Sequence, residues 1–101
     1  MNEIEKKYCE KLYKAILKLK SEDDCRKFFE DICTIKEVLD MSQRLEVANL
    51  LSSGKNYQEV SKTTGASTAT ISRVSRCLNY GSGGYKLVVD EKEKDWYEWF
   101  T

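Results

Sequence analysis

The chain of 101 residues has no proline, no histidine and no apolar run long enough to span a membrane, and we expect no signal peptide. Proline is the strongest interruption of helices, so its absence favours an all-α protein. Histidine is the commonest general base and a common transition-metal ligand, so the usual means of acid–base catalysis and metal binding are missing. We therefore expect a single-domain, soluble, cytoplasmic protein that is not an enzyme, with no metal site, no certain cofactor and no membrane contact.

The cysteines are few and unpaired in sequence. There are four of them, none in a C-x-x-C pair, and each lies in or beside an apolar stripe: Cys9, Cys25, Cys33 and Cys77. Buried free thiols in a reducing compartment are the favoured interpretation, and disulfides or a metal site are the alternative.

Apolar residues at spacings of three and four predict three helices before residue 54. The first covers 2–20, Ser21 caps the second, and the third begins with a capping box of Thr34 and Glu37 and runs to about Ser53. The second helix has a core face of Cys25, Phe28, Phe29 and Ile32. The third is apolar on more than one side, which indicates a central helix that is buried on several sides. Such a helix could be shared between the cores of two subunits.

Residues 56–64 and 67–79 have the pattern of a helix-turn-helix. Gly65 suits a left-handed turn and Ser67 is a good N-cap. The second helix turns one set of residues inward and another outward; the inward set is Ile71, Val74 and Leu78, and the outward set is Thr68, Ala69, Ser72, Arg73 and Arg76. Short polar groups with guanidiniums suit the major groove of DNA. The alternative is an ordinary helical hairpin.

Charge supports the DNA-binding interpretation only locally, because 17 basic residues balance 17 acidic ones. Residues 55–79 carry four basic side chains against Glu59 alone, and residues 67–79 carry no acidic residue. Residues 80–101 hold five carboxylates against three lysines. The positive excess therefore coincides with the candidate recognition unit, as attachment to phosphates requires.

The C-terminal part begins with three glycines between Gly81 and Tyr85, for which a plain flexible linker is the favoured prediction. Asp90 or Glu93 could cap a last helix with Trp96, Trp99 and Phe100 on one face. Three large aromatic residues rarely stay exposed, so we expect this tail to dock on the body or on a partner subunit.

Three segments resemble the Trp repressor superfamily. The run Gly65-Ala-Ser-Thr-Ala-Thr-Ile-Ser-Arg73 is similar to its helix-turn-helix, and Ser42-Gln-Arg-Leu-Glu-Val47 is similar to its central helix. The segment from Arg73 to Tyr85 resembles the YerC/YecD-type branch. The resemblance implies an intertwined all-helical homodimer, with dimerisation helices in 2–53 and the helix-turn-helix in 56–79 of a domain 1–80, followed by a glycine-rich break and helical tail in 81–101. The two recognition units would lie about one turn of DNA apart, roughly 34 Å.

The expected function is that of a sequence-specific DNA-binding transcriptional regulator, with repression as the expected mode and double-stranded DNA as the partner. Its DNA-binding residues would be Gln58, Lys62, Ser67, Thr68, Ala69, Thr70, Ser72 and Arg76, helped by Lys55. The alternative function is a helical protein-interaction module in a transcription complex.

The resemblance also implies an effector pocket, in which Thr34, Arg44 and Arg73 stand where the family holds free tryptophan between two arginines. The Trp repressor has a glycine after the second arginine, whereas this chain has Val74. We expect the branched side chain to fill the space of the indole, which argues against tryptophan as the effector. Arg44 could instead pair with Asp40, and Arg73 could instead face phosphate.

Overall fold

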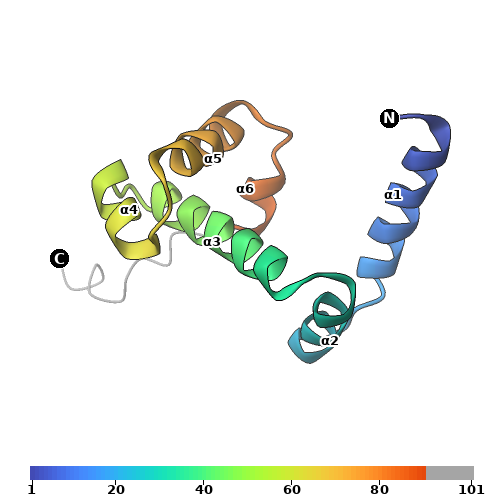
Figure 1. The fold of residues 1–101 in the computed structure, drawn as a ribbon. Coiled ribbons are helices and arrows are strands. Elements are labelled where there is room, and N and C mark those ends of the chain that lie inside the picture. The colour runs from blue at the N-terminus through green and yellow to red at the C-terminus, as the bar shows by residue number, and fades with distance from the viewer. Residues whose placement is uncertain (91–101) are drawn as a thin grey trace. The chain divides into compact units, whose positions relative to one another are not determined.

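The computed structural model describes residues 1–90, which form six helices and no strand, as the all-α prediction requires (Figure 1). The helices are α1 (Glu3–Ile16), α2 (Glu22–Ile32), α3 (Ile35–Ser52), α4 (Tyr57–Thr64), α5 (Thr68–Tyr80) and α6 (Gly84–Val88). The chain divides into two compact units, Met1–Val38 and a second that begins at Leu39. Each unit is described separately below.

In the first unit, α1 starts as expected but ends early. Asn2 caps it, because its side chain accepts from the Glu5 N–H while the Glu5 carboxylate accepts from the Asn2 N–H. The prediction of a helix to Lys20 is wrong, since α1 ends at Ile16. Beyond it the backbone bonds tighten to three-residue spacing, and the Lys20 N–H donates to the Asp24 carboxylate of α2 at 3.1 Å.

Ser21 caps α2, as its sequence position predicts, with its hydroxyl accepting from the Asp24 N–H at 3.0 Å. The predicted core face is only partly covered, because Cys25, Phe28 and Phe29 are half-buried while Ile32 is exposed. Neither α1 nor α2 contains a fully buried residue. The packing within the first unit therefore leaves its apolar stripes largely uncovered.

α3 begins with the predicted capping box. The Thr34 hydroxyl accepts from the Glu37 N–H at 3.1 Å, and the Glu37 carboxylate accepts from the Thr34 N–H at 2.8 Å. The hydrogen bond from the Thr34 N–H to the carboxylate, and to a lesser extent the Thr34 side chain beside it, lower the pKa of Glu37 below its ordinary value. The expected role of Thr34 beside an effector stays a prediction, but its hydroxyl and backbone are engaged in starting α3.

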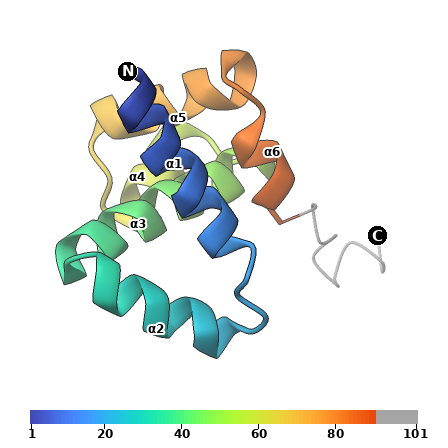
Figure 2. The ribbon, with the colours of Figure 1, turned by 90° about the vertical axis from the view of Figure 1, so that its right-hand side faces the viewer.

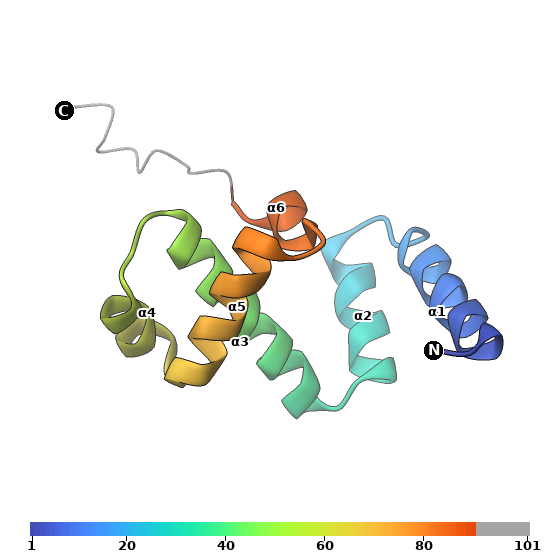
Figure 3. The same cartoon turned by 90° about the horizontal axis from the view of Figure 1, so that it is seen from above.

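The core of the second unit lies where α3, α4 and α5 meet (Figures 2 and 3). α3 contributes Val47 and Ala48, α4 contributes Val60, and the turn and α5 contribute the rest; the buried members are Val47, Ala48, Val60, Ala66, Ile71 and Val74. Leu50, Leu51 and Leu78 pack against this cluster. The predicted inward face of the second helix of the pair is confirmed, with Ile71 and Val74 buried and Leu78 half-buried.

The sequence predicted a plain linker at the glycine-rich segment, and this prediction is wrong. Gly83 takes a left-handed conformation with φ of 85°, and α6 follows immediately. Tyr85 and Val89, four residues apart, pack against the core, and the Asp90 N–H donates to Asn49 Oδ1 of α3 at 3.0 Å. The glycines therefore turn the chain back rather than release it. The expected last helix with Trp96, Trp99 and Phe100 lies outside the described residues.

The cysteines are all free, but they are less buried than expected. Cys9, Cys25 and Cys33 are half-buried, and Cys77 on α5 is exposed. Among residues 1–90, no His, Cys, Asp or Glu residues gather into a group that could hold a metal ion. No helix in the same range is long and apolar enough to cross a membrane.

The capping box predicts how stability depends on pH. Because the folded pKa of Glu37 is lowered, its ionised carboxylate stabilises the fold above the ordinary glutamate pKa of about 4.3, and this contribution is lost as pH falls through the folded pKa. The stability difference between the wild type and Glu37→Gln should thus be constant near neutral pH and shrink below about pH 4.3. Urea unfolding from pH 7 to pH 3 measures it. Glu46→Gln, on the same helix but outside the cap, is the control, and an undiminished difference at pH 3 would contradict the assignment.

Candidate nucleic-acid interface

The turn between α4 and α5 is fixed by a left-handed residue. Gly65 has φ of 73°, and its N–H donates to the Ser61 carbonyl at 2.8 Å to close the end of α4. A Cβ added at Gly65 would meet nothing within 4 Å, so the requirement for glycine comes from the backbone conformation and not from crowding. The sequence prediction for this position is confirmed.

Polar side chains then brace the turn from both sides. The Ser61 hydroxyl donates to the Ala66 carbonyl at 3.1 Å, and the Ala66 N–H donates to Thr64 Oγ1 at 3.1 Å. From α3, the Gln43 amide donates to the Thr64 carbonyl at 3.0 Å. Ala66 is buried, so its backbone groups need these partners. The direction in which α5 leaves the turn is therefore fixed relative to both α3 and α4.

Ser67 caps α5 as predicted. Its hydroxyl accepts from the Thr70 N–H at 3.1 Å and lies 3.1 Å from Thr70 Oγ1. The first turn of α5 contains no acidic residue. The positive end of its backbone dipole is consequently not neutralised locally, which suits an approaching anion.

The structure brings some of the predicted DNA-binding residues together. Gln58, Lys62 and Thr68 line one shallow groove of about 500 Å³, here called the α4–α5 groove, with Tyr57, Ser61 and Ile71. Ala69 and Arg76 are exposed on α5 outside this groove, and Ser72 is half-buried. Tyr57 was missed by sequence reasoning, although it is 43% exposed and directly follows the N-cap of α4.

The basic side chains of this unit are available for a ligand. Within the described part of the chain, Lys55, Lys62, Arg73 and Arg76 make no ion pair, whereas lysine and arginine side chains of α1 and α2 do. Lys62 and Arg76 are also exposed. Uncompensated cations beside an exposed helix N-terminus are what binding to a phosphate backbone requires.

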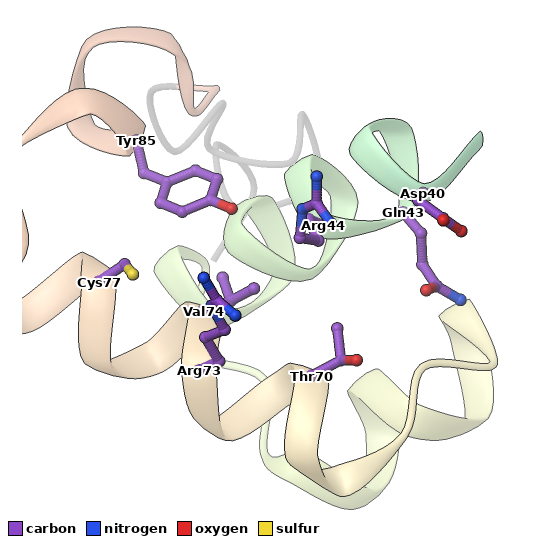
Figure 4. A pocket seen from close by; sticks show the side chains of 8 residues that line it. All are labelled: Asp40, Gln43, Arg44, Thr70, Arg73, Val74, Cys77 and Tyr85. Carbon is purple, nitrogen blue, oxygen red and sulfur yellow. The ribbon is translucent and has the colours of Figure 1, made fainter. Parts of the chain in front are cut away.

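Thr70 is placed differently from the other predicted contacts. It lines a hollow of about 520 Å³ between α3 and α5, here called the arginine hollow, together with Arg44 and Arg73 (Figure 4). The remaining lining residues are Asp40, Gln43, Val74, Cys77 and Tyr85. The structure thus brings the two predicted effector arginines to one site, whereas Thr34 belongs to the first unit.

The side chains around the arginine hollow also decide one alternative. Arg44 makes no ion pair with Asp40 in residues 1–90, so that interpretation of Arg44 is not realised. Val74 is 1% exposed and belongs to both the core and the wall of the hollow. Tyr85 reaches the hollow from α6, with its hydroxyl directed toward Arg44 (Figure 4).

A sequence profile described as Trp repressor protein matches residues 7–93, which includes all of the helix-turn-helix. This chain belongs to the Trp repressor family. Members of this family are regulatory helix-turn-helix DNA-binding proteins and not enzymes. The resemblance given by the segments around Gly65, Ser42 and Arg73 is thereby confirmed.

Relatives place the chain within one part of the family. It is 50% identical over 84 residues to a Bacillus subtilis (strain 168) protein named YerC, itself uncharacterised, and covers 81% of that protein with 83% of its own length. A crystal structure of a TrpR-like protein from Eubacterium eligens ATCC 27750 superposes with a TM-score of 0.78 at 54% identity, covering 81% of this chain and 84% of that one. A candidate Trp repressor from Staphylococcus aureus has a TM-score of 0.79 at 41% identity, covering 89% and 93%.

The turn geometry predicts that alanine destabilises the protein at Gly65 but not at Gly84. Gly65→Ala should lower the free energy of unfolding by about 1–2 kcal/mol, because a left-handed conformation costs an L-residue that much. Gly84→Ala is the matched control, since Gly84 also has open space around it but its φ is not positive. Urea unfolding at equal protein concentration compares the two. Equal effects of both changes would contradict the assigned role of Gly65.

Proposed function

We propose that this chain is a sequence-specific DNA-binding transcriptional regulator, a repressor that acts in the cytoplasm as a homodimer. The observation that carries the proposal is the exposed first turn of α5, held by a braced turn, next to cations with no ionic partner within residues 1–90. Short side chains at Thr68 and Ala69 allow a helix to approach base edges closely. Family membership supports the same function.

In this proposal α5 enters the major groove and α4 rests on the backbone. Thr68 and Ala69 would contact thymine methyl groups or admit bridging water, while Ser72 and Arg76 would reach a base edge or the backbone. Gln58 and Lys62 would position α4 on phosphates, joined by Tyr57, whose phenol can donate a hydrogen bond to a phosphate oxygen. Ser67 and Thr70 would act mainly by capping α5.

The homodimer is supported by apolar surface that one chain leaves uncovered. Ile4 and Tyr8, on the apolar stripe of α1, are 63% and 67% exposed, and Ile35 and Leu39 on α3 are also exposed. A small chain seldom leaves such stripes in water, because burying them is the main source of its stability. A second copy presents the same stripes and can cover them by two-fold symmetry.

Salt dependence tests the DNA interface. If a dimer neutralises about six phosphates, log K should fall with log salt at a slope near −5. Lys62→Ala removes one contact from each subunit, so the slope should become shallower by about 2 and affinity should fall for all sequences alike. Anisotropy titrations of labelled genomic duplexes at several salt concentrations measure both.

Lys27→Ala serves as the charge-matched control, because Lys27 pairs with Asp23 on α2 outside the helix-turn-helix. It should leave the salt slope unchanged. Duplex binding that shows no salt slope, or that survives Lys62→Ala together with Arg76→Ala, would reject the proposed interface. If duplexes do not bind and a protein partner is recovered in fixed ratio, the alternative of a protein-interaction module is correct.

The proposed dimer predicts a large effect of substitution at Tyr8, although Tyr8 is exposed in a single chain. Changes at well-exposed positions usually alter stability by no more than about 0.5 kcal/mol. If Tyr8 lies in a subunit interface, Tyr8→Lys should instead cost several times that and shift the protein toward monomer, because it would bury a charge. Sedimentation velocity across protein concentrations, with Glu10→Lys on the opposite face of α1 as control, distinguishes the cases. A wild type that sediments as a monomer would exclude the dimer.

A further inference from the structure

The arginine hollow already contains an aromatic ring that belongs to the chain itself. Tyr85 is the one aromatic residue among those that line it, and its ring extends from α6 over α5 toward α3 (Figure 4). Arg44 lies on the α3 side and Arg73 on the α5 side of this space. The ring is half-buried and packs against the buried cluster that includes Val74.

α6 holds this ring in place at both ends. Before it, the left-handed Gly83 reverses the chain after α5. After it, the Asp90 N–H donates to Asn49 Oδ1 on α3 at 3.0 Å, a bond between residues 41 apart in sequence. Val89 packs on the same core as Tyr85. A five-residue helix has little stability of its own, so these tertiary contacts decide where Tyr85 lies.

The hollow has little other apolar material between α3 and α5. Apart from Val74, Cys77 and Tyr85, it is lined by polar or charged residues, and its two arginines make no ion pair within residues 1–90. The Tyr85 ring therefore provides the large apolar surface there, and its hydroxyl points toward the Arg44 guanidinium. An aromatic small molecule with a polar group would have to provide the same two features.

We propose that Tyr85 is a built-in occupant of the arginine hollow, which holds α5 against α3 without any small-molecule effector. The inference rests on the proposed DNA-binding function, and it adds that DNA binding by this chain is constitutive. The first turn of α5 has Thr68 in the α4–α5 groove and Thr70 in the arginine hollow. Loosening one side of this turn therefore disturbs the other. If α5 is correctly placed only a tenth of the time without the ring, apparent DNA affinity falls about ten-fold.

Removal and replacement of the ring test the proposal. Tyr85→Ala should weaken binding to duplexes selected on the wild type by about ten-fold, and Tyr85→Phe should bind more tightly than Tyr85→Ala. p-Cresol, the free form of the tyrosine side chain, should restore much of the affinity of Tyr85→Ala and raise its melting temperature. It should leave the wild type unchanged, since the site is already filled. A panel of free amino acids, tryptophan included, should not tighten wild-type binding.

Leu87→Ala is the matched control, because Leu87 is 86% exposed on the same helix and should respond neither in DNA binding nor to p-cresol. If Tyr85→Ala does not fold, Tyr85→Leu keeps apolar bulk without the ring and replaces it in both measurements. Wild-type affinity in the ring-less variant, equal p-cresol shifts in variant and wild type, or an amino acid that tightens wild-type binding would overturn the proposal. If the wild type binds no duplex, the DNA-binding function fails, while the p-cresol melting shifts still decide whether Tyr85 fills the hollow.

Discussion

The arrangement of the second unit depends on the backbone at Gly65. A left-handed residue there ends α4 and lets Ser67 cap α5 after a single buried residue, Ala66. Everything that faces outward on α5 takes its direction from this turn, which is why side chains from α3 and α4 also hydrogen-bond to it. A recognition helix must be rigid before binding, because freedom lost on binding is subtracted from affinity. The structure meets that requirement with hydrogen bonds from side chains of α3 and α4 and not with a large core.

The small size of the core explains the rest of the architecture. Only six described residues are fully buried, all in the second unit, whereas the apolar stripes of α1 and of α3 near Leu39 stay exposed. A chain of this kind has enough internal packing to hold the α4–α5 turn but leaves exposed the apolar stripes that we propose to lie in a dimer interface. Stability of the first unit and spacing of two recognition helices would then come from one interface. DNA affinity and folding are coupled in such a protein through protein concentration.

How far the sequence predicted this structure depends on the range of the interactions involved. The caps at Ser21, Ser67 and Thr34 with Glu37, and the turn at Gly65, are confirmed because each is decided by residues within a few positions of one another. The early end of α1, the helix at 84–88 and the entry of Tyr57 into the α4–α5 groove were not predicted. The last two depend on packing against segments distant in sequence, such as the bond from Asp90 to Asn49, which no local pattern contains.

Two surfaces that could regulate and read DNA meet on one turn of α5. Thr68 belongs to the α4–α5 groove, and Thr70, two residues later, belongs to the arginine hollow. Ile71, the next residue, is buried in the core and anchors this turn of α5. An occupant of the hollow would therefore act directly on the neighbouring residues that we propose to face DNA. When that occupant is a small molecule, its concentration sets how often α5 is correctly placed. When it is a side chain of the same polypeptide, the effective concentration is constant, and regulation must come from protein level or from another partner. The glycines at 81–84 turn the chain back onto α3, and this turn allows a side chain of the same polypeptide to occupy the hollow.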